Sequence, residues 1–227
     1  GTRGKHRTPS FCFRVFRGPK VRVPWKSLAR FSSAPDIFRP MDEPPTDRAF
    51  WDSRYLSGRT PWDQGGVPAA LARYLAAHPG RGARVLIPGC GTGREIAAFA
   101  AGGYTVTAID FSPPAVAQAR VRVGPALAGH VFEGDFFTHN FAAAPFDLVY
   151  ERTFLCALPS DRWPNIAERT AALLKAGGTL AGLYFFGDKD DGPPFGLAPD
   201  EAARIFAPHF DLVVDEPVPA AESLPLF

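Results

Sequence analysis

Three glycines and one aspartate are the residues of this sequence best placed to bind a ligand. An apolar run ends in Gly89, Gly91 and Gly93, and a second apolar run ends in Asp110, 21 residues after Gly89. Glycine lets a backbone turn approach a ligand closely, because a Cβ atom would occupy the ligand's space. The carboxylate can accept hydrogen bonds from the two vicinal hydroxyls of a ribose. The pattern predicts a nucleoside site rather than a glycine turn that only joins a strand to a helix.

The glycine spacing favours a nucleoside without phosphates. A dinucleotide site usually reads G-x-G-x-x-G, with a pyrophosphate at the N-terminus of the following helix, whereas this sequence reads G-x-G-x-G. Glu95 also falls in the first turn of that helix, where a carboxylate suits the helix dipole but repels a phosphate. We therefore expect S-adenosylmethionine as the cofactor. A nicotinamide-dependent dehydrogenase of a related fold is the weaker alternative.

The elements that position these residues alternate between strand and helix. Apolar runs bounded by turn residues predict strands, and periodic apolar residues predict helices. This alternation indicates an α/β fold: a Rossmann-like, doubly wound, mostly parallel sheet with helices on both faces. Strands are expected at about 84–88, 104–109, 130–133, 146–152, 179–186 and 210–214, and helices at about 46–58, 67–77, 92–101, 112–122, 160–175 and 200–206.

Composition narrows the class of protein. The 227 residues, 46% of them hydrophobic, are enough for one α/β domain and a little more. No run approaches the roughly 20 apolar residues that span a bilayer, so we expect no membrane partner. The three cysteines form no C-x-x-C pair, which argues against zinc and disulfides and favours a reducing compartment, the cytoplasm.

Basic charge is concentrated in residues 1–40. That segment holds ten of the 25 Lys and Arg residues but only one of the 23 acidic residues, Asp36. The remaining residues are therefore acidic, and we expect no nucleic-acid partner. Residues 1–40 fit a mitochondrial transit peptide, a non-native extension upstream of Met41, or a basic arm that binds RNA or anionic lipid. In each case we expect this leader to be largely disordered and dispensable, with the folded domain at 41–227.

Five segments together resemble the thiopurine S-methyltransferase superfamily, and in particular its thiol and halide methyltransferases. The resemblance extends over residues 46–227, and the pairing of a TPWDQG loop with PGCGTGRE is more specific than the glycines alone. The segments are FWDSRYLSGRTPWDQGG (50–66), VLIPGCGTGRE (85–95), AIDFSPPAV (108–116), EGDFF (133–137) and FDLVYERTFLCAL (146–158).

The resemblance implies an aromatic lid and a glycine loop at the cofactor. Trp51, Tyr55 and Trp62 match the aromatic positions of the lid, although many relatives have tryptophan in place of Tyr55. Aromatic faces attract a sulfonium as they attract other cations. Ordinary helix packing and loop anchoring are the alternative roles of these rings. Gly89 matches the glycine-loop contact, and Gly91 lies beside it.

Four further positions complete the implied cofactor site. Asp110 matches the ribose-binding acid, and Asp135 and Phe136 match the segment beside the adenine. Arg152 matches an arginine of the thiopurine enzymes and a tyrosine of the plant halide enzymes. It can hold an anionic acceptor or shape the methionine end of the cofactor, and an ion pair with Glu151 is its other interpretation.

The implied reaction moves a methyl group to a small, soft nucleophile: a thiol, a thiopurine, thiocyanate or a halide. Such an acceptor needs little help from a base, so catalysis rests on positioning and desolvation, and we expect no catalytic side chain and no metal. We expect a monomer in the cytoplasm, or in mitochondria if residues 1–40 are a transit peptide.

One element of the resemblance is missing from the sequence pattern. A methyltransferase sheet adds an antiparallel strand beside its fifth strand, and no candidate for it follows residues 210–214. We therefore expect a sheet that lacks its last strand, with the C-terminus cut short and an exposed edge. A non-catalytic binding protein with a methyltransferase fold is the corresponding alternative function.

Overall fold

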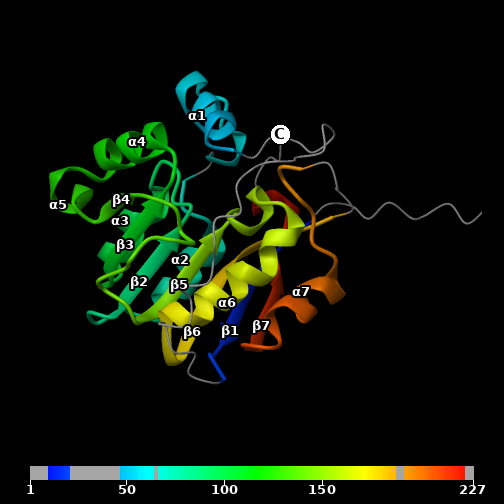
Figure 1. Cartoon of the computed structure of the whole chain (residues 1–227). Coiled ribbons are helices and arrows are strands. Elements are labelled where there is room, and N and C mark those ends of the chain that lie inside the picture. Colours follow the sequence, from blue (N-terminus) through cyan, green and yellow to red (C-terminus); the bar gives the residue numbers. More distant parts are fainter. Residues whose placement is uncertain (1–9, 21–46, 64–65, 188–191, 223–227) are drawn as a thin grey trace, which may run out of the picture.

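The computed structural model describes residues 10–20, 47–63, 66–187 and 192–222. At its centre lies one mixed sheet of seven strands in the order β4-β3-β2-β5-β6-β1-β7 (Figure 1). β2 is parallel to β3 and β5, β3 to β4, and β5 to β6, whereas β1 is antiparallel to both β6 and β7. The strands are β1 (Ser10–Arg17), β2 (Arg84–Pro88), β3 (Thr105–Asp110), β4 (Val131–Glu133), β5 (Phe146–Arg152), β6 (Leu174–Phe186) and β7 (Asp211–Pro217).

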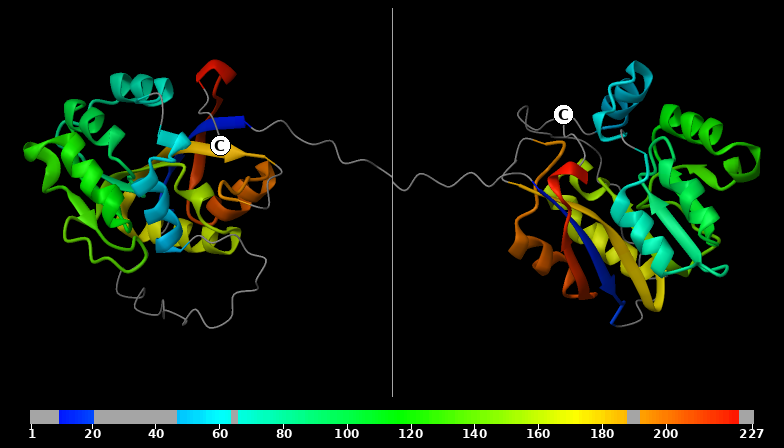
Figure 2. Two further views of the ribbon diagram at one scale, coloured as in Figure 1. Left: turned by 90° about the horizontal axis from the view of Figure 1, so that it is seen from above. Right: turned by 180° about the vertical axis from the view of Figure 1, so that it is seen from behind.

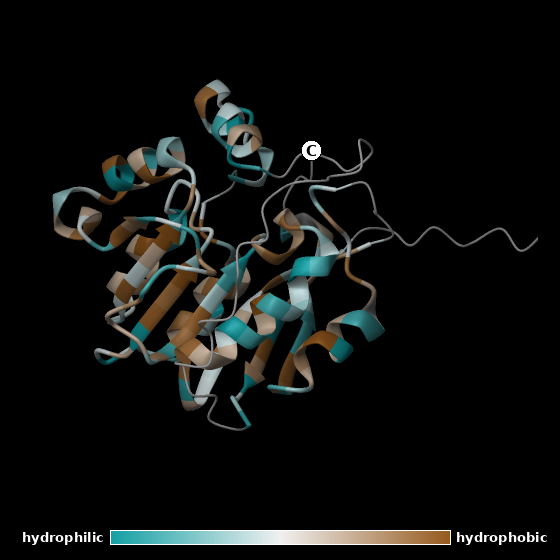
Figure 3. Cartoon of the chain, viewed as in Figure 1, coloured by the Kyte–Doolittle hydropathy of each residue, from teal (hydrophilic) through white to brown (hydrophobic). Residues whose placement is uncertain are grey.

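Helices cover both faces of the sheet, as the sequence predicts. α6 and α7 bury Trp163 and Phe206 against one face, and α2, α3 and α4 bury Leu71, Phe99 and Val116 against the other. Figure 3 shows apolar residues gathered on the strands. The helices are α1 (Arg48–Ser57), α2 (Ala69–Ala77), α3 (Arg94–Ala101), α4 (Pro113–Val123), α5 (Pro125–Ala128), α6 (Trp163–Leu173) and α7 (Pro199–Phe206), with 3-10 turns at Pro61–Asp63, Leu155–Ala157, Ser160–Arg162 and Ala220–Glu222.

Most expected elements are confirmed, and the largest difference in their bounds is at β6. This strand begins at Leu174 rather than at residue 179, because α6 ends at Leu173. Gly177, with φ of +71°, and Gly178 are therefore inside the strand rather than in a turn before it. The pairing of β6 with β5 shifts in register between Phe146 and Leu148, which accommodates this glycine pair.

The expectation of a disordered leader is wrong for Ser10–Arg17, which forms β1; residues 1–9 and 21–40 lie outside the described residues. β1 lies between β6 and β7 (Figure 2, right). Phe11 and Phe13 are buried on one face of the sheet and Phe16 on the other. The arginines of this segment predict an arm in contact with solvent. Arg14 is instead buried and forms a two-point ion pair with Asp215. Burial on both faces and a neutralised charge make this segment an internal strand.

The expectation of a missing antiparallel strand is wrong for the same reason. The position beside β6 is filled by β1, so the sheet has no gap between β6 and β7. The strand comes from the region before the resemblance begins, rather than from the region after β7. The folded unit therefore includes Ser10–Arg17 as well as the domain expected at 41–227.

Within the part of the chain that the structure describes, every helix is too short or too polar to cross a lipid bilayer.

Candidate functional site

One pocket, of about 660 Å³, opens where the parallel strands end. Gly89 follows β2, Asp110 ends β3 and Arg152 ends β5, and all three line the pocket. In open α/β sheets, ligands bind at this edge, outside the carboxyl ends of the strands. The structure brings all nine predicted residues to this pocket: Trp51, Tyr55, Trp62, Gly89, Gly91, Asp110, Asp135, Phe136 and Arg152.

The glycine turn fixes the carboxylate of Asp110. The backbone N–H of Gly91 donates to Oδ2 of Asp110 at 2.8 Å, and the N–H of Ser112 donates to Oδ1 at 3.0 Å. Burial raises the pKa of Asp110 to about 6, while these backbone donors act in the opposite direction. The carboxylate is thus oriented before any ligand arrives and is ionised at neutral pH. Each carboxylate oxygen has two acceptor sites, so both can accept further bonds.

The backbone conformation and the neighbouring side chains leave no room for a Cβ atom at the glycines of this turn. Gly89 and Gly91 have φ of +56° and +52°, in the left-handed region that side chains rarely adopt. A Cβ atom on Gly89 would collide with the ring of Phe154, and one on Gly91 would lie 2.9 Å from the hydroxyl of Tyr55. The space beside these glycines, which the sequence assigns to a ligand, is therefore occupied in part by the side chains of Phe154 and Tyr55.

The predicted lid aromatics form a cluster at one end of the pocket. α1 begins at its cap Asp47, which accepts from the N–H of Phe50 at 2.9 Å. The helix places Trp51 and Tyr55 one turn apart on its buried side. The ring of Trp62 meets both edge-on, with centroid distances of 5.5 Å to Trp51 and 6.2 Å to Tyr55. These rings wall the pocket, so their packing and their predicted ligand role are compatible.

Two side-chain contacts hold α1 over the edge of the sheet (Figure 1). The hydroxyl of Ser112 donates to Asp52 at 2.5 Å, and the amide of Gln118 donates to the carbonyl of Tyr55 at 3.0 Å. Ser112 also lies beside Asp110 in the chain. The wall of aromatic rings is thereby connected to the same loop that holds the carboxylate.

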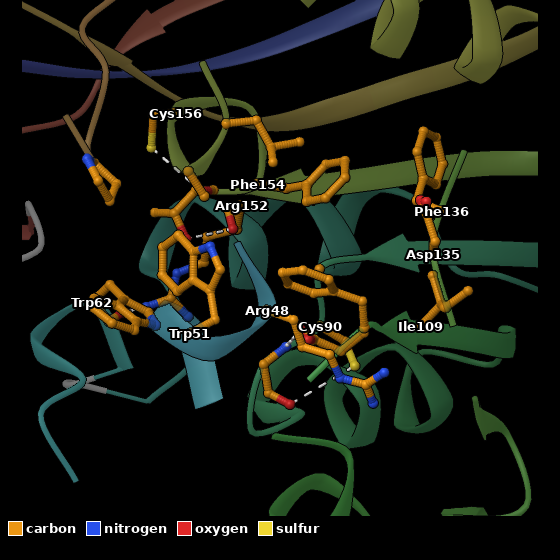
Figure 4. Close-up of a pocket in the computed structure, with 18 of the residues that line it drawn as sticks. Arg48, Trp51, Trp62, Cys90, Ile109, Asp135, Phe136, Arg152, Phe154 and Cys156 are labelled. Carbon is orange, nitrogen blue, oxygen red and sulfur yellow. Dashed lines mark hydrogen bonds between the residues drawn. The ribbon is translucent and has the colours of Figure 1, made fainter. Parts of the chain in front are cut away.

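Asp135 and Phe136 lie at the other end of the pocket, away from Trp51 and Trp62 (Figure 4). Asp135 is exposed, and its Oδ1 accepts from the N–H of Phe137 at 2.7 Å. Phe136 is buried and packs edge-on against Phe154, with centroids 5.3 Å apart. A flat apolar surface and a polar acceptor are thus adjacent, which suits the ring and the amino group of an adenine.

Arg152 pairs with Glu95 rather than with the neighbouring Glu151. Both side chains of the pair are almost completely buried, at 7% and 8% exposure. Nη2 of Arg152 also donates to the carbonyl of Trp62 at 3.1 Å. Because Arg152 neutralises Glu95, the repulsion of a phosphate predicted for Glu95 does not operate. Only the spacing of the glycines then distinguishes this site from a dinucleotide site.

Glu151 has a different structural role. Its Oε2 accepts from the backbone N–H of Phe154 at 2.9 Å and of Leu155 at 3.0 Å. Burial raises the pKa of Glu151 to about 7, while the two backbone donors act in the opposite direction. This carboxyl therefore supports the turn after β5, which lines the pocket through Thr153 and Phe154.

Sequence reasoning missed several lining residues. Phe111 directly follows Asp110, and Phe154 follows Arg152, so their places after strand ends were available as a signal. Thr153 also lines the pocket and has φ of +60°, a backbone strain that no sequence pattern reveals. Asp63 is the fourth, and its position next to Trp62 in the TPWDQG loop was its only signal.

The two cysteines at the pocket are not activated. Burial raises the pKa values of both Cys90 and Cys156 well above that of an ordinary thiol, so both carry their protons. Both side chains are buried, so we interpret them as packing residues. Among the described residues, no group of histidine, cysteine and acidic side chains has the arrangement of a metal site.

Comparison with solved structures identifies the class of protein that this fold defines. A magnesium protoporphyrin IX methyltransferase from Synechocystis PCC 6803 with bound S-adenosylmethionine matches with a TM-score of 0.56 and 16% identity, over 71% of this chain and 84% of that chain. A TehB-like S-adenosylmethionine-dependent methyltransferase from Corynebacterium glutamicum matches with a TM-score of 0.52 and 20% identity, over 71% and 83%. The fold is thus that of the S-adenosylmethionine-dependent methyltransferases.

Sequence comparison then identifies the family. The family described as Thiopurine S-methyltransferase (TPMT) matches residues 46–221. Probable thiol methyltransferase 2 of Arabidopsis thaliana is 32% identical over 162 residues, which cover 70% of this chain and 71% of that protein. Thiopurine S-methyltransferase of Bordetella petrii is 34% identical over 189 residues, covering 74% and 85%. The chain belongs to the thiopurine S-methyltransferase family and is a methyltransferase that uses S-adenosylmethionine.

Proposed function

We propose that this enzyme transfers the methyl group of S-adenosylmethionine to a small, soft nucleophile: a thiol, a thiopurine, thiocyanate or a halide. The observation that carries the proposal is the meeting of nine residues, predicted from separate segments, around one pocket. The related proteins named above are a thiol methyltransferase and a thiopurine methyltransferase, and a further relative, 30% identical, is Thiocyanate methyltransferase 1 of Brassica oleracea.

The residues of the pocket fit this cofactor in size and chemistry. Its volume of about 660 Å³ falls within the range of roughly 300–1,000 Å³ that small-molecule sites occupy. Asp110 is fixed by two backbone donors and retains free acceptor sites for two ribose hydroxyls. We assign the ribose to Asp110, the backbone contact to Gly89 and Gly91, and the adenine to Asp135 and Phe136.

The aromatic end of the pocket suits the reacting part of the cofactor. When bound, S-adenosylmethionine supplies an activated methyl group on a positively charged sulfur. Trp51, Tyr55 and Trp62 offer ring faces, which stabilise a cation, and apolar surface, which excludes water. Arg152 lies at the same end through its contact with the carbonyl of Trp62. These four residues complete the proposed cofactor-binding set.

A soft, anionic acceptor carries no proton that a side chain of the enzyme would have to remove. Cys90 and Cys156 hold their protons, and Glu151 is occupied by two backbone donors. We therefore expect the acceptor to arrive as an anion, as thiocyanate and halides do, or as a group that attacks without a base. The rate then depends on alignment and on exclusion of water, worth several kcal/mol of the barrier when geometry is well fixed.

We also infer a cytoplasmic monomer with no nucleic-acid or membrane partner. The cysteine usage and the acidic character of the chain after residue 40 support this. A mitochondrial leader cleaved after residue 40 would conflict with β1, because cleavage would remove the strand that pairs with both β6 and β7.

Binding and turnover assays on the full chain test the proposal. S-adenosylhomocysteine and NAD are titrated separately by calorimetry, and thiophenol, thiocyanate and iodide are then supplied with S-adenosylmethionine. We expect micromolar binding of S-adenosylhomocysteine, no binding of NAD, and methylation of at least one acceptor. Binding of NAD alone would support a dehydrogenase instead. Cofactor binding without turnover of any soft nucleophile would support a non-catalytic binding protein.

A further inference from the structure

The turn Pro61–Asp63 carries Trp62 to the pocket, and polar contacts on two sides hold it there. The turn is short, and all three of its residues are only half-buried, so it buries little apolar surface of its own. Trp62 nevertheless has a defined position, packed edge-on against Trp51 and Tyr55. The contacts that fix this position come from charged side chains outside the aromatic cluster.

Asp63 makes the first set of contacts. Its Oδ2 accepts from the hydroxyl of Thr92 at 2.7 Å, and its Oδ1 accepts from Nε of Arg94 at 2.7 Å. Arg122 adds a longer ion pair at 3.8 Å. The carboxylate is only 15% exposed, so these charge-assisted bonds are partly shielded from water. Thr92 and Arg94 belong to the glycine turn and to the start of α3, so Asp63 joins the Trp62 turn to the glycine turn.

Arg152 makes the second set of contacts. Its Nη2 donates to the carbonyl of Trp62 at 3.1 Å, and its Nη1 lies 3.5 Å from the carbonyl of Gly66 on the far side of the turn. Its charge is balanced by Glu95, and the two side chains are 7% and 8% exposed. Figure 4 shows Arg152 at the same end of the pocket as Trp62 and Trp51. The guanidinium is thus directed at the backbone of the Trp62 turn and at α3.

We propose that Asp63 and Arg152 are positioning residues that hold the Trp62 turn over the cofactor, with Glu95 as the counter-ion of Arg152. Arg152 then acts on the cofactor through the position of Trp62 and is not the residue that holds the acceptor. This proposal rests on the proposed function, because it assumes that S-adenosylmethionine occupies the pocket. It adds Asp63 and Glu95 to the residues on which cofactor affinity depends.

The test is a double-mutant cycle between Asp63 and Trp62 in the full-length enzyme. We expect Asp63→Asn, which loses a charge-assisted bond, and Trp62→Ala, which loses the ring, each to raise the KM for S-adenosylmethionine about tenfold, with kcat changed less than about threefold. The double variant should be no worse than Trp62→Ala alone, because Asp63 acts only through Trp62. Arg73→Met, which breaks the exposed ion pair of Arg73 with Glu222, is the matched control and should leave both constants unchanged.

Variants of Arg152 distinguish positioning of the lid from binding of the acceptor. Arg152→Met should raise the KM for S-adenosylmethionine and leave the KM for the acceptor unchanged, while Arg152→Lys should recover part of the cofactor affinity. If Arg152→Met fails to fold because Glu95 is left buried and unpaired, Glu95→Gln/Arg152→Met removes that charge and gives the same readout. The melting temperature of each variant reports any general loss of structure.

Three outcomes would overturn the proposal. Additive effects of Asp63→Asn and Trp62→Ala would show that Asp63 does not act through Trp62. A rise in the acceptor KM alone in the Arg152 variants would make Arg152 an acceptor ligand. Unchanged cofactor constants in Asp63→Asn would remove its positioning role. Failure of the wild-type enzyme to bind S-adenosylhomocysteine is measured first and would instead refute the proposed function.

Discussion

The sheet has two parts that differ in how far apart their strands lie in the sequence. The first part is β4, β3, β2 and β5, and the second part is β6, β1 and β7. In the first part, each strand is followed by a helix or a turn, and every pairing is parallel. In the second part, β1 lies between strands more than a hundred residues away in the sequence, and both of its pairings are antiparallel. The pocket belongs to the first part. The site is thus assembled from segments that are each recognisable in the sequence, whereas closure of the sheet depends on β1, which lies far from β6 and β7 in the chain.

The two parts meet at one place near the pocket. Pro193 and Pro194, which follow β6, line the pocket, and the N–H of Phe195 donates to the carbonyl of Cys156 at 2.7 Å. Phe16 of β1 packs on Phe206 with centroids 4.8 Å apart, on the same side of the sheet as Phe195. Loss of β1 should therefore affect the part of the pocket lined by Pro193 and Pro194 indirectly, by removing packing beneath β6.

Deletion of residues 1–20 should have the largest effect and directly tests the role of the second part. It removes the strand that joins β6 to β7 and leaves the facing edges of both strands unpaired, so we expect loss of cooperative unfolding and of S-adenosylhomocysteine binding. Circular dichroism and thermal melts report the first, calorimetry the second. Deletion of residues 1–9, which leaves β1 intact, is the control and should behave as the full chain. Full cofactor affinity without residues 1–20 would restore the expectation that the leader is dispensable.

Asp215→Asn should destabilise the second part without reaching the pocket. It leaves the buried guanidinium of Arg14 without its carboxylate, which is bound at 2.8 and 2.9 Å. We expect the free energy of unfolding to fall by about 1.5–3 kcal/mol, with cofactor affinity unchanged. Asp211→Asn is the matched control, because its pair with Lys20 is exposed on both sides and is worth about 0–1 kcal/mol. Equal losses in urea denaturation of the two variants would argue against a buried Arg14.

Glu151→Gln should reveal a pH dependence that belongs to the first part. The folded pKa of Glu151 is raised from 4.5 to about 7, so stability from its protonated form is present below pH 4.5 and is lost as pH rises through 7. Gln has no such loss. Between pH 4.5 and pH 8 the stability difference should therefore move in favour of the variant by about 1–3 kcal/mol. A difference that stays constant with pH in thermal or urea unfolding would mean that Glu151 titrates normally.

The affinity for S-adenosylhomocysteine should fall below pH 6, the smallest of these effects. The pKa of Asp110 in the free enzyme is raised to about 6, and the ribose hydroxyls donate to its ionised form. Affinity is then highest above pH 6 and should be about tenfold weaker at pH 5. Asp110→Asn, which does not titrate, should bind more weakly and show no change over this range. A flat profile for the wild-type enzyme would separate Asp110 from the ribose.

The sequence predicted the first part of the sheet well because its signals are local. The strand predicted at 84–88 is observed with those bounds, and Asp110 is the last residue of β3, as predicted. The nine site residues come from five segments that the topology brings to one edge, and each segment is recognisable by itself. Their convergence on one pocket needed only a parallel sheet and short connections.

The rest depends on long-range contacts that leave little trace in a local window. From the sequence alone Arg14 has the character of a surface charge, because its partner Asp215 is 201 residues away, and so the local pattern predicts a disordered leader where β1 lies. The partner of Arg152 was likewise misassigned, since Glu151 is adjacent in the chain but Glu95 is adjacent in space. The family match begins at residue 46 and gives no information about residues 10–17.

The most direct test of the central claim is the calorimetric titration of S-adenosylhomocysteine into the wild-type chain and into Asp110→Ala. The substitution removes the acceptor of two ribose hydrogen bonds, each worth roughly 1.5–3 kcal/mol when charge-assisted. The account predicts micromolar binding by the wild type and a loss of at least about tenfold in the variant, with a melting temperature that still shows a folded protein. Equal affinities of the two proteins would contradict it, because the pocket would then hold the cofactor without the carboxylate around which the site is assigned.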